Sequence, residues 1–296
     1  ISFLSTFMKN PTLSPYASKV LMYATEIYPA AIYDYLSAPG SMKDMEINFQ
    51  TAKSYIKACK TLIAFSFCKE SPLPCKGIPQ FIKDVVLNFF QTSLYEQFDR
   101  RSQRWSTLTA FLETVYDIIS CDRDFCVEIQ KNDISVKHLL FIIHQTSLIL
   151  QKPPMIERES DSHRLDNDKF RIIIQFDCVA LALLNKLVTS NLADPNQELS
   201  YLCQSFFSND IDGVSSDERS TFFTVLISFL EITNPLASRL HLYALQLLDL
   251  LCEIAGRMPS ISVDSFYPHS SQRILKEFIK TNLFKMDGNT NIEQNI

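Results

Sequence analysis

Residues 108–119, LTAFLETVYDII, place apolar side chains at the spacing of one helix face. The apolar positions follow the steps i, i+3, i+4, i+7, i+10 and i+11, which fall along one side of an α-helix. They are Leu108, Phe111, Leu112, Val115, Ile118 and Ile119. This stretch predicts an amphipathic helix that packs on one side.

The sequence on either side of this stretch repeats the helical pattern. A second stripe precedes it, and residues 172–188 and 236–254 are apolar almost all round, which indicates central helices covered on several sides. Because no alternating strand pattern competes, we predict an all-α fold of about eleven or twelve helices beginning at Ser14. The second stripe consists of Phe81, Ile82, Val85, Val86, Phe89, Phe90 and Leu94.

Glycine and proline support the same interpretation. The 296 residues contain only five glycines, whereas an average chain contains roughly 7%. Glycine supplies the positive φ of tight turns and phosphate-binding loops, so its scarcity favours helices joined by short connectors. Four prolines stand where the first turn of a helix tolerates them. They occur in Ser14-Pro15, Ile78-Pro79, Asp194-Pro195 and Asn234-Pro235.

Long helices joined by short connectors, with no strand between them, resemble the armadillo/HEAT class of α-solenoids over Ser14–Leu283. The resemblance implies an irregular solenoid of stacked antiparallel helix pairs that binds proteins along an extended surface. The helices rich in Phe and Leu are also similar to the partner subunits of checkpoint kinases, which implies a genome-maintenance or checkpoint assembly. The alternative fold is an irregular helical bundle.

The domain organisation predicted from composition is one helical-repeat domain over 14–284. Residues 1–13 are expected to be a lead-in and 285–296 a flexible tail, and the first residue, Ile1, suggests a piece of a longer chain. Residues 152–169 contain nine charged residues, two prolines and no helical stripe. We expect them to form a polar, mobile loop. It could divide the protein into two halves, but we favour an insertion between two repeats of one continuous array.

Composition and cysteine spacing indicate the kinds of partner and the cellular compartment to expect. The net charge of −5 gives no general attraction to nucleic acid or to a membrane surface. The longest uncharged apolar run, Leu139–Leu150, is too short to span a bilayer, and polar residues interrupt 171–188, so no membrane partner is expected. The eight cysteines form no CxxC motif, which favours reduced thiols in a nuclear or cytoplasmic protein.

Motifs for catalysis or metal binding are missing from the sequence. Asn209–Gly213 resembles the start of an EF-hand loop, but the twelfth position of that loop is Arg219 in place of a bidentate Glu. No HExxH, GxSxG, P-loop or dinucleotide-binding pattern occurs. His138 and His144 fall on a strongly apolar helix, where we expect structural histidines. We therefore expect no catalytic residue, no cofactor, no metal and a protein that is not an enzyme.

The uneven distribution of charged residues along the sequence gives the best candidates for binding residues. Residues 41–104 contain ten Lys and Arg against six Asp and Glu. Within them, three lysines share a helix face, and three arginines precede the single tryptophan. The candidate partner-binding residues are Lys53, Lys57, Lys60, Arg100, Arg101, Arg104 and Trp105.

Three interpretations of these residues remain open. They are a solvated helix face with Trp105 anchoring the next helix, a protein-binding patch, or a nucleic-acid-binding surface. For the whole protein, we predict a scaffold, adaptor or regulatory subunit that binds one or more proteins in an intracellular complex. The alternatives are a nucleic-acid-associated solenoid and an all-α enzyme or ligand-binding bundle.

Overall fold

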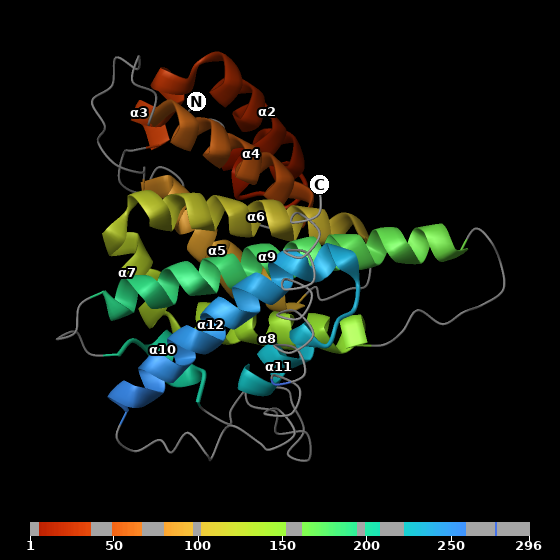
Figure 1. Ribbon diagram of the computed structural model, residues 1–296. Coiled ribbons are helices and arrows are strands. Elements are labelled where there is room, and N and C mark those ends of the chain that lie inside the picture. The colour runs from red at the N-terminus through yellow and green to blue at the C-terminus, as the bar shows by residue number, and fades with distance from the viewer. Residues whose placement is uncertain are drawn as a thin grey trace, which may run out of the picture. The chain divides into compact units, whose positions relative to one another are not determined.

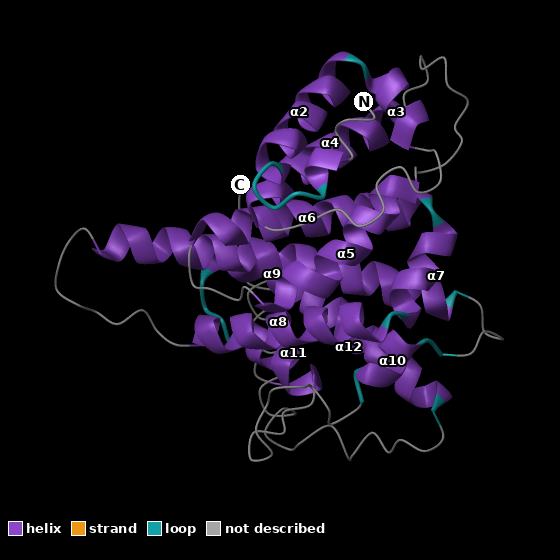
Figure 2. Cartoon of the chain, turned by 180° about the vertical axis from the view of Figure 1, so that it is seen from behind, coloured by secondary structure: helices purple, strands orange, loops and turns teal. Residues whose placement is uncertain are grey.

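The computed structural model contains only helices as regular elements in its described residues, with no strand among them (Figure 2). The all-α prediction is confirmed over this part of the chain. The predicted tail at 285–296 and the EF-hand-like segment 209–213 lie outside it. The structure describes residues 6–36, 49–66, 80–96, 102–151, 162–193, 199–207, 222–258 and 276.

The chain divides into two compact units, 1–142 and 143–296. The sequence predicted a single domain over 14–284, with the polar segment as an insertion between repeats. The division falls instead inside helix α8 (Asp133–Gln151), which contributes its first part to one unit and its second part to the other.

In the first unit, helix α4 lies between α2 and α6 (Figure 1). Helix α3 contacts both α2 and α4, helix α5 contacts both α4 and α6, and α7 contacts α6. Each helix therefore packs on its near neighbours in the sequence. The bounds are α2 Ser14–Ile27, α3 Pro29–Leu36, α4 Phe49–Ser66, α5 Gln80–Glu96, α6 Ser102–Cys121 and α7 Arg123–Lys131.

The described side chains of the two apolar stripes predicted from the sequence are buried in the core of this unit. The rings of Phe89 and Phe111 lie with their centroids 4.0 Å apart, and Phe90 meets Phe111 edge-on at 5.1 Å. All three side chains are buried. Edge-on and tilted aromatic pairs add to the stability gained by burying apolar surface. Helices α5 and α6 are therefore joined by the residues that the periodicity selected.

Single polar residues connect the last helices of the first unit. The Asp122 carboxylate accepts a hydrogen bond from the Phe125 amide at 2.9 Å, which caps the start of α7. Asn132 Oδ1 accepts from the Ser135 amide at 2.9 Å and caps α8 in the same way. These caps satisfy amides that have no partner within their own helix. Connectors this short agree with the scarcity of glycine.

Helix starts also follow the sequence signals where the structure describes them. Helix α2 begins at Ser14, directly before Pro15, and α5 begins at Gln80, directly after Pro79. In the second unit, Asn234 Oδ1 accepts a hydrogen bond from the Leu236 amide at 2.9 Å and starts a 3₁₀ turn ahead of α12. The start predicted at Asp194-Pro195 lies outside the described residues.

In the second unit, helix α12 packs along α9 and against α11. Asn185 Nδ2 of α9 donates to the Tyr243 carbonyl of α12 at 3.0 Å. At the other end of α12, the Arg257 guanidinium donates to the Leu192 carbonyl at 3.0 Å. The two segments predicted to be central helices thus pack on each other. The bounds are α9 Ser162–Leu192, α10 Tyr201–Ser205, α11 Phe222–Leu230, η1 Pro235–Ala237 and α12 Ser238–Arg257.

The predicted polar loop at 152–169 is wrong in its second half. Helix α9 begins at Ser162, so residues 162–169 are helical, while 152–161 lie outside the described residues. Once the apolar part of α9 has formed, each further residue adds a hydrogen bond without a new nucleation cost. No proline stands in 162–169 to stop this extension.

Helix α9 also contains a segment, Phe170–Leu192, that could cross a membrane by length and composition. It is the one such segment found in the described residues, with a mean hydropathy of 1.7. In the second unit, 61% of its most apolar window is buried. A core helix has the same composition, so this finding is weak evidence for a membrane span.

Candidate functional site

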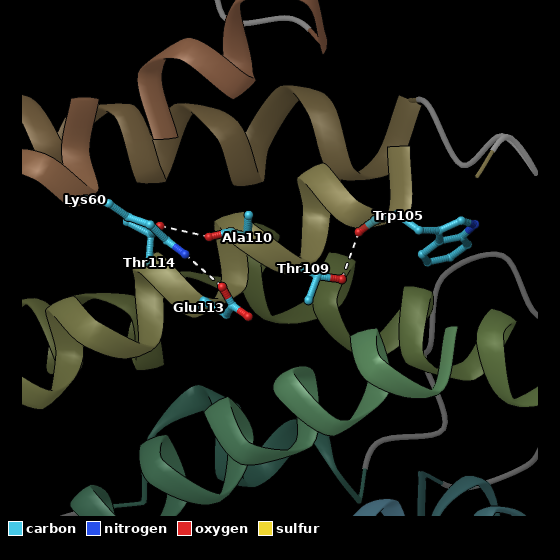
Figure 3. Close-up of polar contacts among 6 residues, drawn as sticks. All are labelled: Lys60, Trp105, Thr109, Ala110, Glu113 and Thr114. Carbon is cyan, nitrogen blue, oxygen red and sulfur yellow. Dashed lines mark hydrogen bonds and ion pairs between the residues drawn. The ribbon is translucent and has the colours of Figure 1, made fainter. Parts of the chain in front are cut away.

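Two of the three lysines on the predicted basic face of α4 form ion pairs with neighbouring helices. Lys57 pairs with Glu26 of α2, and Lys60 Nζ lies 2.7 Å from Glu113 Oε2 of α6 (Figure 3). Lys53 is exposed and forms no ion pair with a described residue. This face therefore links α4 to both flanking helices, and much of its charge is neutralised.

The pKa values on this face reflect the same pairing. The hydrogen bond and the Coulomb attraction of Glu26 raise the pKa of Lys57 above its ordinary value. Burial raises the pKa of Asp117, the positive charge of Lys60 lowers it, and the negative charge of Glu113 raises it again. Lys60 thus faces two carboxyl groups of α6. An acidic environment of this kind does not favour a polyanion such as nucleic acid.

Trp105 is a core residue, so its prediction as part of an exposed partner-binding patch is wrong. Its side chain is only 5% exposed, and its carbonyl accepts a hydrogen bond from Thr109 Oγ1 at 2.8 Å (Figure 3). Trp105 stands three residues before Leu108 and seven before Leu112, on the apolar stripe of α6. The interpretation of Trp105 as a helix anchor agrees with this burial.

The three predicted arginines are not placed by the structure. Arg100 and Arg101 lie outside the described residues. Arg104 belongs to α6, but its side chain lies outside what the structure describes. Their role in partner binding stays a prediction.

The most unusual surface of the described residues is an apolar row on α2 that the sequence analysis missed. Four side chains spaced by four, three and four residues share one face of the helix. We call this row the α2 stripe. It consists of Tyr16 (69% exposed), Val20 (52%), Tyr23 (57%) and Ile27 (65%).

Exposed large apolar side chains are concentrated around this row. Of the eleven found in the described part of the chain, seven lie between Phe7 and Tyr28. Scattered apolar side chains are normal on protein surfaces, whereas a contiguous group indicates an interaction site. The opposite face of α2 is buried through Ala17, Leu21 and Thr25. The covered face of α2 therefore combines Ala17 and Leu21 with small hydroxyl residues, whereas the larger apolar side chains stand on the exposed face.

A charged margin borders the α2 stripe. Lys19 and Glu26 are seven residues apart, so they lie two turns from each other on the same side of the helix. Glu26 marks this side as the one facing α4, because it pairs with Lys57. Lys19 is exposed and forms no ion pair with a described residue. Because Lys57 neutralises Glu26, the positive charge of Lys19 is the one left over along this margin.

A depression lies at the start of α2, beside the first residue of the stripe. Its volume is about 400 Å³, and the Asn10 side chain shapes the preceding turn by accepting from the amides of Thr12 and Leu13 at 3.0 and 3.3 Å. Such an Asx turn holds the backbone in place without a helix. The depression is lined by Pro11, Thr12, Pro15, Tyr16 and Lys19.

A sequence signal for the α2 stripe existed. Within residues 14–28, large apolar side chains recur at helical spacing from Tyr16 to Ile27. Periodicity identifies this face as apolar, but it does not say whether another helix covers it.

Reactive groups elsewhere are buried or scattered. No group of three or more His, Cys, Asp or Glu that could hold a metal occurs in the described ranges. The six described cysteines are free thiols, and burial raises the pKa of Cys59 to about 12 and that of Cys178 to about 11. Thiols with such pKa values are poor nucleophiles.

Two of the described histidines contact backbone carbonyls. His138 Nδ1 lies 2.9 Å from the Phe90 carbonyl, and His241 Nε2 lies 3.0 Å from the Ile232 carbonyl. Burial lowers the pKa of His241. For His138, this contact fits the structural role expected from the sequence.

Comparisons with known proteins give no family assignment. No protein-family model matches the sequence, and no significant match is found among curated proteins or solved structures. The α2 stripe and its margin are therefore interpreted from their own chemistry.

Proposed function

We propose that this chain is a non-enzymatic helical-repeat scaffold, adaptor or regulatory subunit that binds another protein in a larger nuclear or cytoplasmic assembly. The α2 stripe is the observation that carries the proposal. Its four apolar side chains are each more than half exposed and stand in one row. Aromatic and aliphatic side chains in a contiguous exposed group are typical of protein interfaces.

The packing order of the first unit supports an α-solenoid arrangement for that unit. Helices α2, α4 and α6 pack in sequence order, and α3 and α5 each contact two of them. Repeat arrays of the armadillo/HEAT type are built from such contacts between neighbours. The interhelical pairs of Lys57 and Lys60 join successive members of this series.

Protein binding is better supported than nucleic-acid binding. A nucleic-acid surface needs unpaired Lys and Arg side chains that can replace counterions on phosphates. On α4, only Lys53 among the three candidate lysines is without an ion pair to a described residue.

Photo-crosslinking tests the proposal directly. We would place p-benzoylphenylalanine at Tyr16 or at Tyr23 of the full chain in cells and identify the captured proteins by mass spectrometry. A matched control carries the same probe at Leu242 of α12, an exposed apolar residue of the second unit.

The expected result is a discrete protein captured from both stripe positions and not from Leu242. Adding Val20→Asp, which places a charge within the stripe, should abolish the capture. If both stripe probes capture no more than the Leu242 probe, the proposed function is wrong.

A further inference from the structure

We infer that the α2 stripe binds one amphipathic helix of a partner protein, and that acidic residues of this helix flank its apolar face on the Lys19 side. This inference rests on the proposed function and names the chemistry of the partner. It follows from the position of α2 in the first unit, the length and area of the stripe, and the charge of its margin.

Helix α2 is at an edge of the packed helices of the first unit. Helix α4 has α2 and α6 on its two sides, whereas α2 packs on α3 and α4. A helical array needs a polar outer face on its terminal helix to stay soluble. The outer face of α2 carries Tyr16, Val20, Tyr23 and Ile27 instead. An edge helix with this composition is suited to receive one more helix.

The geometry of the stripe matches a helix. From Tyr16 to Ile27 the row advances eleven residues, which is about 16 Å along the helix axis. Its side chains form one ridge of the kind that packs into the groove of a second helix. The α2 backbone is hydrogen-bonded within its own helix, so it offers no edge to which an extended strand could pair.

The area of the stripe suits a single helix better than a folded second copy. At about 200 Å² for a whole tyrosine, the stripe exposes on the order of 450 Å², of which the two tyrosines account for about 250 Å². A standard interface between two folded proteins buries about 800 Å² on each side. One helix of three to four turns can cover the smaller area.

The charged residues beside the α2 stripe indicate the charge that a partner helix should carry. Glu26, the acidic residue of this margin, is already paired with Lys57. Lys19 on α2 and Lys53, one turn from Lys57 on α4, each form no ion pair with a described residue. A partner helix with Asp or Glu beside its apolar face would complement these two lysines, whereas Lys or Arg there would be repelled.

A displayed peptide library tests this inference with the full chain as bait. The peptides would have sixteen residues, with Leu, Phe or Trp at i, i+3, i+4, i+7 and i+11 and an equal mixture of Asp, Lys, Ser and Gln at the flanking positions. After sorting, the flanks should be enriched in Asp on one side of the apolar face. The selected peptide is then measured by fluorescence anisotropy.

Three variants of the chain test which residues bind the selected peptide. Lys19→Glu should weaken the selected peptide about three- to fivefold, and replacing the flanking Asp of the peptide by Lys should restore the affinity. Tyr23→Ser with Val20→Ser should weaken it at least about tenfold. Leu242→Ser, the matched control in the second unit, should leave it unchanged. Lys19, Val20 and Tyr23 are all exposed, so circular dichroism should show an unchanged helix content in these variants.

Several results would contradict the inference of an acidic helix as partner. Enrichment without a charge bias, or affinity that the stripe variant retains, overturns the acidic-helix partner. Sedimentation that shows a dimer lost in the stripe variant assigns the stripe to a second copy of the chain and also overturns it. If any of these results accompanies specific photo-crosslinking of a different protein at Tyr23, the proposed function stands and only the partner chemistry is wrong.

Discussion

Replacing Asp177 by Asn should stabilise the second unit at neutral pH and leave it nearly unchanged at acid pH. Asp177 lies in α9, and its side chain is fully buried. Burial raises the pKa of this carboxyl well above its ordinary value of 3.8, and it outweighs the opposing effect of the hydrogen bond that Thr146 can donate to the ionised carboxylate. The carboxyl group is therefore a buried acid that resists ionisation.

The hydrogen bonds of Thr146 indicate where the proton lies. Thr146 Oγ1 is 2.6 Å from Asp177 Oδ1 and 2.8 Å from the Ile143 carbonyl. A hydroxyl group carries one proton, so it cannot donate to both oxygens. Both short contacts are satisfied when the protonated carboxyl of Asp177 donates to Oγ1 and Oγ1 donates to Ile143. An Asn side chain can make the same donation through Nδ2.

The sign and size of the effect follow from proton linkage. Between pH 3.8 and the native pKa of Asp177, the native state binds a proton that the unfolded state has released. The free energy of unfolding of the wild type therefore falls as pH rises, by about 1.4 kcal/mol per pH unit in this window. The stability that the raised pKa of Asp177 contributes is fully present below pH 3.8, and it is lost once the pH has risen to the native pKa. The Asn side chain of Asp177→Asn does not titrate, so the difference in free energy of unfolding between the two proteins grows at this rate as pH rises.

Urea denaturation followed by circular dichroism measures this difference at a series of pH values. Subtracting the free energy of unfolding of the wild type from that of Asp177→Asn at each pH removes the contribution of all other titrating groups. Thr146→Val, which breaks the chain of hydrogen bonds, should destabilise the unit by about 1–3 kcal/mol. Thr189→Val, the same substitution at an exposed position of α9, should change stability by no more than about 0.5 kcal/mol. A difference between wild type and Asp177→Asn that is constant from pH 3.5 to pH 7 would refute the reasoning.

Three further predictions concern the first unit. Trp105→Ala should destabilise it by about 3–5 kcal/mol, because the side chain is buried; a variant that keeps wild-type stability in thermal denaturation contradicts this. A double-mutant cycle on Lys60 and Glu113 should give a coupling of about 0.2–1 kcal/mol that weakens in high salt, and no coupling would mean that the pair is a surface contact without energetic effect. Iodoacetamide should modify the exposed Cys121 in the native protein and Cys59 only after unfolding, as mass spectrometry of the labelled peptides would show; rapid native labelling of Cys59 is the opposing result.

Much of the fold follows from local sequence. The stripes at 81–94 and 108–119 predicted two helices, and their phenylalanines meet in the core. Pro15 marked the start of α2, because proline fits the first turn of a helix and disrupts later turns. The error at 162–169 has a physical cause as well: composition suggested a loop, but a helix extends easily once its apolar part has formed.

The candidate site was less accessible from the sequence. Lys57 and Lys60 were correctly placed on one helix face, but their partners Glu26 and Glu113 are distant in the sequence. Trp105 was assigned to a patch although its spacing to Leu108 put it on a core stripe. The α2 stripe was overlooked because its side chains differ little in type from buried ones.

The amino-acid sequence by itself determined that this protein is built from helices, where several of them begin, and which faces of them are apolar. Periodicity, caps and proline positions act within a few residues of the chain, so they can be recognised without the rest of the molecule. Tertiary structure alone decided which apolar face is covered and which charges are paired. Burial depends on which helix lies against a face, and in α2 the covered face is the one with Ala17 and Leu21, while the row from Tyr16 to Ile27 stays exposed.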